Sequence, residues 1–410
     1  MEKVVITGMG AISALGLSVQ ENWGNLLNGV SGVGPNTLFD TSDYLVKIAC
    51  VVKDFVPENY MDAKEVRRRD RYEQFATVAT AEALKQSGLE ISEKNSGRVG
   101  VVIATGVGGI TSLEDAIFLI RDTNPRKVSP FLIPMLMPNG ATGLVAIDHG
   151  IHGPCFAVSS ACASGADGIG TAMMMLRAGM IDAAIAGAAE ATISRAAVAA
   201  FDRIQAMSRR NDDYSMTPQP FDKNRDGLVI GEGAGILILE TETHARARGA
   251  NILAEMAGYA ATADAYHITA PHSEGAGGAQ AIRNSLASAQ VNADEVGYIS
   301  AHGTGTPLND LSETKAVKAA FGAQAYKTPI SSTKSMTGHM MGATGALEAI
   351  ICVQAIREGK LPPTIHYSTP DPNCDLDYIP NTARDTKISV AMSNAFGFGG
   401  HNAVLVVRKY

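Results

Sequence analysis

Charge and tryptophan are scarce in this chain of 410 residues, of which 18% are charged and only one is tryptophan. The net charge of −7 and the lack of an arginine-rich arm argue against a nucleic-acid partner. No stretch of about 18 consecutive apolar residues occurs, so we expect no membrane-spanning helix and no membrane partner. With 46% hydrophobic residues, the chain has enough apolar side chains to bury a large core.

The chain also has few cysteines, and they follow no regular spacing. There are five: Cys50, Cys155, Cys162, Cys352 and Cys374. This odd, scattered set matches neither the disulfide framework of a small secreted domain nor a zinc-binding pattern, so no metal is predicted. The first residues show no signal peptide, because a charged pair is followed at once by an apolar strand. We therefore expect a reduced, cytoplasmic protein.

The glycine-rich opening lacks one residue of the dinucleotide-binding pattern. Gly8 and Gly10 begin a G-x-G-x-x-G motif, but Ser13 stands where the third glycine is needed. That glycine lets the following helix pack closely against its strand beside the pyrophosphate. The opening is therefore predicted to be a plain buried strand, and no nucleotide cofactor is expected.

Two pieces of the chain recur. Residues 99–108 share their Val-Gly start and their small residues with 296–305, and residues 163–179 share theirs with 343–359. An internal duplication explains both pairs. The alternation of β-rich runs with Ala/Gly-rich helical stretches then predicts an α/β protein of two similar layered halves, residues 1–250 and 251–410.

The duplication also locates individual elements. The first half has extra residues near 125–138, where four prolines interrupt an apolar run, and we expect a long ordered loop there. Strands are expected at residues 99–104, 183–188, 236–239, 298–301, 389–392 and 403–407.

Cys162 lies in the stretch FAVSSACASGADGIG, residues 156–170. We interpret 156–158 as a buried strand and the small residues around Cys162 as the start of a buried helix. A cysteine there lies near the positive end of the helix and near unpaired N–H groups, which favour the thiolate. The same N–H groups could stabilise an oxyanion. Taken alone, Cys162 could equally be a small buried core residue.

Two histidines are specific to the second copy of the repeat. His302 follows a predicted strand in SAHGTGTPLND, and Lys334 and His339 lie in SSTKSMTGHMMGATG before the second helix. The first copy has Thr105 in place of His302 and Ser159 in place of His339. Because equivalent helix starts face each other in a pseudo-twofold fold, His339 is expected near the cysteine. A cysteine with two imidazoles is suited to acyl transfer followed by carbon–carbon bond formation.

These motifs, with NAFGFGGHN at residues 394–402, resemble those of the β-ketoacyl-acyl carrier protein synthases. The likeness is strongest to the elongating synthase II type of bacterial type II fatty acid synthesis and covers essentially the whole chain. The resemblance implies a thiolase-like fold of two duplicated halves in α-β-α-β-α layers and a homodimer. It also implies acyl- and malonyl-loaded acyl carrier protein as the partner, and no cofactor.

The resemblance further implies a decarboxylative Claisen condensation. Cys162 would take the acyl chain from its carrier, and CO₂ loss from malonyl-carrier would then generate the carbanion that attacks it. His302 and His339 would stabilise the enolate, and either could act as a base. The backbone N–H groups of Cys162 and Phe398 would form the oxyanion hole.

Other roles likewise come only from the resemblance. Lys334 paired with Glu348 would support the site, and Asp310 would hold a loop. The phosphopantetheine arm would be bound by Thr304, Thr306 and Thr269. The acyl pocket would be lined by Val107 and Phe201, together with residues 131–133 of the partner subunit. The carrier protein would dock on Arg67, Arg68 and Arg203. The basic run at 63–71 is explained equally well as a solvated helix face.

Four other activities of related proteins can be compared with these motifs. A degradative thiolase usually needs a second cysteine late in the chain, where Phe398 stands here, and His339 argues against the initiating synthase III class. A ketosynthase of a type II polyketide pathway shares every catalytic motif. A non-catalytic subunit similar to a chain-length factor would lack the nucleophile that Cys162 supplies.

Overall fold

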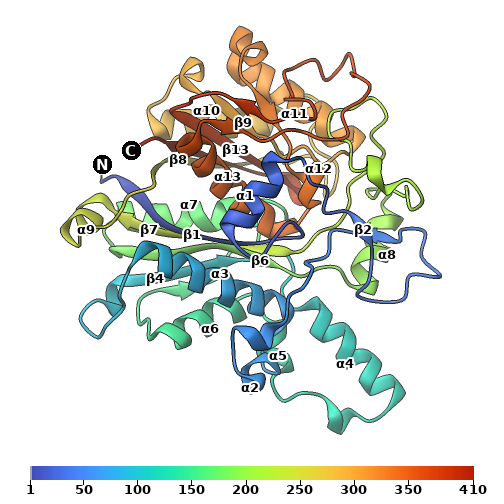
Figure 1. Ribbon diagram of the computed structural model, residues 1–410, viewed down its shortest axis with the longest axis vertical. Helices are drawn as coiled ribbons and strands as arrows, with labels where there is room; N and C mark the ends of the chain where they lie inside the picture. The colour runs from blue at the N-terminus through green and yellow to red at the C-terminus, as the bar shows by residue number, and fades with distance from the viewer. Residues whose placement is uncertain (1) are drawn as a thin grey trace.

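The computed structural model describes residues 2–410, which form five layers of alternating helices and strands (Figure 1). A ten-stranded sheet has the order β10-β9-β13-β14-β8-β1-β7-β6-β4-β5. Its two central strands, β1 and β8, pair only through Val5 with Glu255 and Ile6 with Ala254. The sheet therefore divides at this point into two parts, which lie one above the other in Figure 1.

The two parts of the sheet contain equivalent strands. The lower part consists of β1 (Val4–Ile12), β4 (Val99–Ala104), β5 (Cys155–Phe156), β6 (Ala183–Glu190) and β7 (Gly233–Thr241). The upper part consists of β8 (Ala254–Ala263), β9 (Tyr298–Ser300), β10 (Ile330–Ser331), β13 (Val390–Gly397) and β14 (His401–Arg408). From the outer edge inward the orders β5-β4-β6-β7-β1 and β10-β9-β13-β14-β8 correspond strand for strand. This correspondence is the duplication that the sequence predicted, although the division at residue 250 itself stays a prediction.

Helices fill the other three layers. The outer face of the lower strands is covered by α3 (Arg71–Ser87) and α6 (Gly140–His149), and the outer face of the upper strands by α10 (Ala276–Ala289) and α11 (Pro307–Phe321). Between the two parts of the sheet lie α7 (Ser164–Arg177) and α13 (Thr344–Glu358). The remaining helices are α1 (Val19–Leu27), α2 (Ala63–Val66), α4 (Ile110–Asp122), α5 (Leu132–Leu136), α8 (Arg195–Arg203), α9 (Glu242–Ala247) and α12 (Lys334–Thr337).

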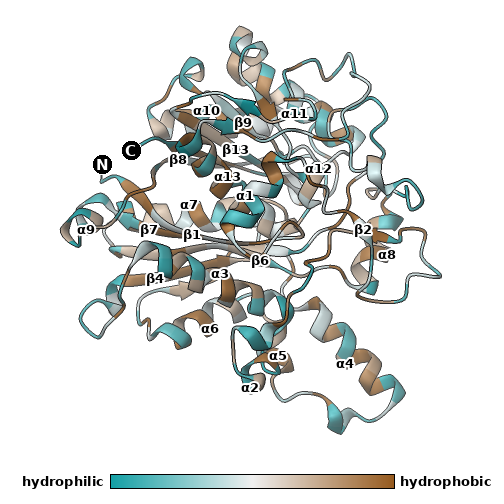
Figure 2. Ribbon diagram, in the orientation of Figure 1, coloured by the Kyte–Doolittle hydropathy of each residue, from teal (hydrophilic) through white to brown (hydrophobic). Residues whose placement is uncertain are grey.

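The helices α7 and α13 are buried because small residues let them approach each other closely. A Cβ on Gly165 would lie 2.8 Å from the backbone N of Ala346, and one on Gly345 would lie 3.0 Å from that of Ala166. The largest apolar cluster surrounds these helices, and Figure 2 shows hydrophobic colouring along the strands β1, β6 and β7 that face them. The starts of α7 and α13 thus meet at the centre of the molecule, where the sequence predicted that Cys162 and His339 would lie close together.

Two expectations about the first half were wrong. The buried strand expected at residues 156–158 is only the two-residue β5, Cys155–Phe156. Both of its residues are exposed, because β5 is the outermost strand and pairs with β4 alone. The proline-rich insertion is not a plain loop: it follows helix α4 and contains α5, and in Figure 1 the segment projects away from the layers. Within residues 2–410, no helix combines the length and the apolar character that crossing a membrane requires.

Candidate active site

Cys162 lies on a tight turn between β5 and α7. The preceding residue, Ala161, has a positive φ of 52°, a conformation that costs free energy for any residue except glycine. The helix α7 begins at Ser164, two residues after Cys162, with Ala163 as its N-cap. The turn directs the Cys162 side chain toward the second half of the fold, and only 9% of the residue is exposed.

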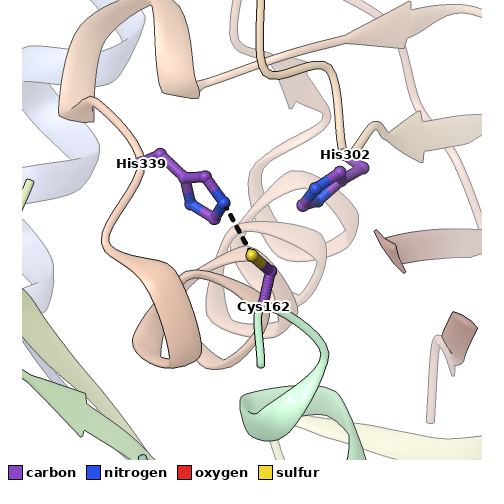
Figure 3. Close-up of side chains that lie close together, drawn as sticks. All are labelled: Cys162, His302 and His339. Carbon is purple, nitrogen blue, oxygen red and sulfur yellow. Dashed lines mark hydrogen bonds between the residues drawn. The ribbon is translucent and has the colours of Figure 1, made fainter. Parts of the chain in front are cut away.

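Both predicted histidines lie beside this sulfur, as Figure 3 shows. The Nε2 atom of His339 is 3.1 Å from the Sγ atom of Cys162, and its Nδ1 atom is 3.1 Å from Oγ1 of Thr344. The ring of His302 lies 5.3 Å from that of His339, nearly perpendicular to it. The ligating atoms of the cysteine and the two histidines all lie within 4.8 Å of one another. The structure therefore brings together three side chains that are up to 177 residues apart in sequence.

Burial keeps all three groups neutral. It raises the pKa of Cys162 to about 11, although the ammonium of Lys334 and the backbone N–H groups of Phe398 and Cys162 act in the opposite direction. The backbone N–H groups at the turn favour the thiolate, as expected, but desolvation of the sulfur outweighs them. Burial, and after it the charge of Lys334, lowers the pKa values of His302 and His339 well below the usual range. Near neutral pH the thiol proton must leave as the sulfur attacks.

The backbone of the NAFGFGGHN segment approaches the cysteine turn at a glycine. A Cβ on Gly397 would lie 3.0 Å from the backbone N of Cys162 and 3.1 Å from the carbonyl O of Ser160. This close approach brings the N–H of the next residue, Phe398, to the sulfur, where it forms a hydrogen bond that favours the thiolate. Two backbone donors, those of Cys162 and Phe398, thus converge on the reacting position, as an oxyanion hole requires.

Lys334 and Glu348 form a buried ion pair beneath the site. The Nζ of Lys334 lies 2.6 Å from Oε1 of Glu348, and both side chains are 1% exposed. Burial raises the pKa of Glu348 to about 7, with a smaller contribution from the charge of Glu313, and the ammonium opposes this shift.

A cleft of about 320 Å³ leads to the sulfur. Residues from both halves of the chain line it, including the predicted Phe201, Thr269, Thr304, Thr306 and Phe398. The hydroxyls of Thr304 and Thr306 lie 2.9 Å apart, and the Phe201 and Phe398 rings lie 6.0 Å apart. Asp310 lies beneath the threonine loop, where it accepts hydrogen bonds from the N–H groups of Phe221 and Gly305.

Some predicted residues lie elsewhere. Val107 does not line this cleft, and 42% of it is exposed. Arg67 is exposed, and the guanidinium of Arg68 stacks on the Phe131 ring at 4.7 Å. Arg203 ends α8, which lies apart from α2 in Figure 1, so the predicted docking arginines do not form one patch on a single chain.

The basic run 63–71 contributes fewer free cations than its composition suggests. Arg69 is 4% exposed and pairs with Asp148 at 2.7 Å, whereas Arg71 pairs with Glu232 at 2.7 Å. The run is therefore partly a structural feature.

Two buried carboxylates at the site were missed by the sequence analysis. Glu313 accepts hydrogen bonds from the N–H groups of His302 and Gly303, and Glu190 accepts them from Gly106 and Gly342. The buried residues of α11 include the polar Asp310, Ser312 and Thr314 as well as Glu313, so no pattern in the sequence singled Glu313 out.

Among residues 2–410, Cys162, His302 and His339 are the only group that could hold a metal ion. These are also the three reactive groups.

Comparisons with known proteins identify the family. Models of the N-terminal and C-terminal domains of beta-ketoacyl synthases match residues 1–245 and 253–368. The 3-oxoacyl-[acyl-carrier-protein] synthase 2 of Staphylococcus aureus (strain COL) is 50% identical over 409 residues, covering 100% of this chain and 99% of that protein. The protein of the same name from Synechocystis is 47% identical over 409 residues, covering 100% of this chain and 98% of that protein.

Solved structures of other proteins indicate the same family. A beta-ketoacyl synthase from Burkholderia phymatum STM815 has a TM-score of 0.92 at 35% identity, with 100% of both chains covered. A ketosynthase in complex with its type II polyketide acyl carrier protein has the same TM-score and identity, covering 100% of this chain and 99% of the other. These matches confirm the resemblance and the thiolase-like fold that the motifs implied. The chain therefore belongs to the β-ketoacyl synthase family, whose two domain models together span Cys162, His302 and His339.

Proposed function

We propose that this chain is the elongating β-ketoacyl-acyl carrier protein synthase of fatty acid synthesis. The observation that carries the proposal is the Cys162 thiol in a cleft, in contact with the neutral imidazole of His339 and within 4.8 Å of the neutral imidazole of His302. No cofactor is needed for this chemistry, because both substrates arrive as thioesters on acyl carrier protein.

In the first half-reaction the Cys162 sulfur attacks the thioester carbonyl of an acyl-carrier. The thiol proton leaves the sulfur during attack, and the Nε2 of His339 at 3.1 Å is positioned to accept it. The N–H groups of Cys162 and Phe398 stabilise the oxyanion. The carrier's C–S bond then breaks, the carrier thiol takes up the proton, and an acyl-cysteine remains.

In the second half-reaction malonyl-carrier occupies the cleft and loses CO₂. The electron pair of the broken C–C bond forms an enolate, whose oxygen accepts hydrogen bonds from the neutral imidazole of His302 and from that of His339 in the tautomer that carries its proton on Nε2. The enolate carbon attacks the acyl-cysteine carbonyl, and the C–S bond to Cys162 breaks. One proton is taken up to regenerate the thiol, and β-ketoacyl-carrier is released.

Intact-mass spectrometry of the chain after incubation with an acyl-carrier tests this proposal. We expect a mass increase equal to one acyl group on Cys162, and its loss, with CO₂ release, when malonyl-carrier is added. A chain that gains no acyl mass would be a non-catalytic subunit, contrary to the proposal. A series of acyl-carriers of increasing length would then define the preferred substrate.

We also propose that Arg67, Arg68 and Arg203 dock the acidic carrier protein. Arg67 and Arg203 are exposed and have no carboxylate at ion-pair distance among the described residues, whereas Arg68 also pairs with Glu65 at 3.0 Å. Thr304, Thr306 and Thr269 would then bind the phosphopantetheine arm inside the cleft. Charge reversal at Arg67 should raise the KM for the carrier and leave kcat unchanged.

A homodimer is proposed from the exposed edge of the sheet. β5 pairs on one side only, and its Phe156 is exposed. Large exposed apolar residues lie on β5 and on the segment that precedes it, from the end of β4 through α4, the insertion and α6: Val107, Ile117, Ile120, Ile133, Met137, Ile147 and Phe156. A patch of this kind indicates a protein interface, and an equivalent edge from a second copy would cover β5 and place the insertion beside the partner's acyl pocket. Sedimentation of Ile147→Lys, expected as monomer, tests this.

We propose that the protein acts in the cytoplasm and in fatty acid elongation. The five free cysteines suit the reducing cytoplasm. A polyketide ketosynthase is the second candidate, favoured by the solved neighbour bound to a polyketide carrier at 35% identity. The 50% identity to synthases named for 3-oxoacyl-carrier products favours fatty acid elongation, and analysis of the released products distinguishes the two.

A further inference from the structure

A buried carboxylate, Asp167, lies behind the cysteine turn and takes no part in the chemistry proposed above. It is on the first turn of α7 and is 9% exposed. Its Oδ2 accepts a hydrogen bond from the Ser160 hydroxyl, and its Oδ1 accepts one from the Tyr259 hydroxyl at 2.7 Å. Ser160 precedes Cys162 by two residues, whereas Tyr259 belongs to β8 in the other half. Asp167 therefore connects the cysteine turn to the second half of the fold.

A glycine allows Tyr259 to reach this carboxylate. A Cβ on Gly170 would lie 2.3–2.5 Å from three atoms of the Tyr259 ring, a distance too short for any side chain. The ring therefore packs directly on the backbone of α7. Because Gly170 follows Asp167 by three residues, both lie on the same face of the helix. Burial and the charge of Asp167 raise the pKa of Tyr259, so its hydroxyl stays protonated and acts as the donor.

The turn needs support because of its backbone conformation. Ala161, with its positive φ, lies between Ser160 and Cys162. The N–H of Ser160 donates to Oγ of Ser164 at 2.9 Å, and the Ser164 hydroxyl donates to the carbonyl of Ala161 at 2.6 Å. These two bonds hold the backbone of the turn, whereas the bond to Asp167 fixes the Ser160 side chain.

The second copy of the repeat has no such network. The positions equivalent to Ser160 and Asp167 are occupied by Met340 and Leu347, both of which are apolar and buried. The network is thus confined to the half of the chain that carries the nucleophile.

We propose that Asp167, oriented by Tyr259, is a positioning residue for the Cys162 nucleophile. It holds Ser160 so that Ala161 keeps its left-handed conformation and the Cys162 sulfur stays within 3.1 Å of His339. Its action is geometric, because its two oxygens accept hydrogen bonds from Ser160 and Tyr259, whereas the sulfur itself is hydrogen-bonded to His339. The effect of Asp167 on acylation by a carrier rests on the proposed function. Its effect on the reactivity of the Cys162 thiol does not.

The test removes the two hydroxyl donors and the carboxylate separately, in Tyr259→Phe, Ser160→Ala and Asp167→Asn. Loss of one hydrogen bond should slow acylation of Cys162 about fivefold, and Asp167→Leu should slow it about 10²-fold, because the sulfur is then misplaced. Decarboxylation of malonyl-carrier depends on His302 and His339, which the network does not touch, and should stay within about twofold of the wild type. The melting temperature is recorded for every variant.

Alkylation of Cys162 by iodoacetamide provides a readout that needs no carrier. Its rate should fall in the same order, while the pH midpoint of the reaction stays unchanged in Tyr259→Phe and Ser160→Ala, because neither variant removes a charge. If the wild type were alkylated but never acylated by a carrier, the proposed function would fail and this inference would still be tested.

Tyr72→Phe is the matched control. Tyr72 is a buried tyrosine on α3 whose hydroxyl donates to the carbonyl of Met137, remote from the cleft. This variant should acylate and alkylate at the wild-type rate. Unchanged acylation and alkylation in Asp167→Asn and Asp167→Leu would overturn the inference. So would an equal fall in acylation and decarboxylation, because a general loss of structure affects both.

Discussion

The Nζ of Lys334 lies 2.6 Å from Oε1 of Glu348, and both side chains are buried in the interior of the protein. Burial lowers the pKa values of His302 and His339, and the Lys334 ammonium lowers them further. The same ammonium opposes the effect of burial on Cys162. One ion pair therefore influences the protonation of all three reactive groups.

Replacing Lys334 by Met should change both the pH dependence and the stability. Without the ammonium, the pKa values of His302 and His339 rise toward 6.5, so the imidazoles become protonated at a higher pH as the solution is acidified. The acid limb of the malonyl decarboxylation profile should therefore move to higher pH. Without the ammonium the pKa of Glu348 rises further, so the buried carboxyl takes up a proton, and the loss of its hydrogen-bond partner should cost about 1–3 kcal/mol. Decarboxylation rates and urea unfolding measure the two effects.

Lys315→Met is the control, because Lys315 pairs with Glu274 at 2.8 Å on the surface. Exposed ion pairs contribute about 0–1 kcal/mol, so this variant should behave like the wild type. An unshifted acid limb in Lys334→Met would show that the ammonium does not affect the imidazoles.

Replacing Gly397 by Ala should slow acylation strongly. The added Cβ would lie 3.0–3.2 Å from three backbone atoms of the cysteine turn, which is tighter than ordinary contact. The turn and the Phe398 N–H must then move apart, and loss of one oxyanion donor costs about 10²–10³ in rate. Single-turnover acylation followed by mass spectrometry measures this.

Gly24→Ala provides the comparison for that variant. Gly24 lies inside α1, and a Cβ there would meet nothing within 4 Å. Alanine should therefore stabilise the helix by about 0.5–1 kcal/mol and leave acylation unchanged. If Gly397→Ala were acylated as fast as Gly24→Ala, the two backbone donors would not be needed for the reaction.

Much of the site was predictable from the sequence because the duplication relates distant segments. The repeat of 163–179 in 343–359 predicted that the starts of α7 and α13 meet, and hence that His339 lies near Cys162. The strands β4, β6 and β14 also lie where runs of small and β-branched residues predicted them. These features depend on local pattern and on symmetry, both of which can be read from one chain.

The features that were missed depend on surroundings that the chain brings together only on folding. The pKa of Cys162 is raised because helices and strands from both halves exclude water from the sulfur, and this outweighs nearby donors. The insertion was expected to be a loop because prolines usually interrupt helices. Here Pro125 begins a 3₁₀ turn and Pro134 lies in the short helix α5, so prolines do not exclude helical structure. Exposure of β5 follows from its position at the sheet edge, which an apolar run does not reveal.

Replacing Asp70 by Ala should loosen two helices at once. Oδ1 of Asp70 caps α3 by accepting the N–H of Tyr72 at 3.1 Å. Its Oδ2 accepts the N–H of Ser112 at 3.1 Å and the hydroxyl of Thr111 at 2.9 Å, near the start of α4. Loss of these bonds should lower the free energy of unfolding by about 1–3 kcal/mol. Hydrogen exchange should accelerate in the first turns of both helices.

Asp62→Ala separates capping from simple loss of charge. Asp62 is the N-cap of α2, but its side chain makes no capping hydrogen bond. Its removal should change stability by less than about 0.5 kcal/mol. Faster exchange confined to α3 in Asp70→Ala would show that this carboxylate does not hold α4.

Glu240 should make the protein sensitive to acid. Burial raises its pKa, but hydrogen bonds from Arg248, His244 and Thr7 outweigh this and lower it to about 2. Because the folded-state pKa lies below the unfolded value of 4.5, the stabilisation is complete above pH 4.5 and is lost as the pH falls toward 2. Glu240→Gln should therefore be about 3 kcal/mol less stable than the wild type at pH 7, with the difference narrowing below pH about 4.5. Urea unfolding at several pH values measures this, and a difference that stayed constant down to pH about 3 would contradict it, because a purely steric effect does not titrate.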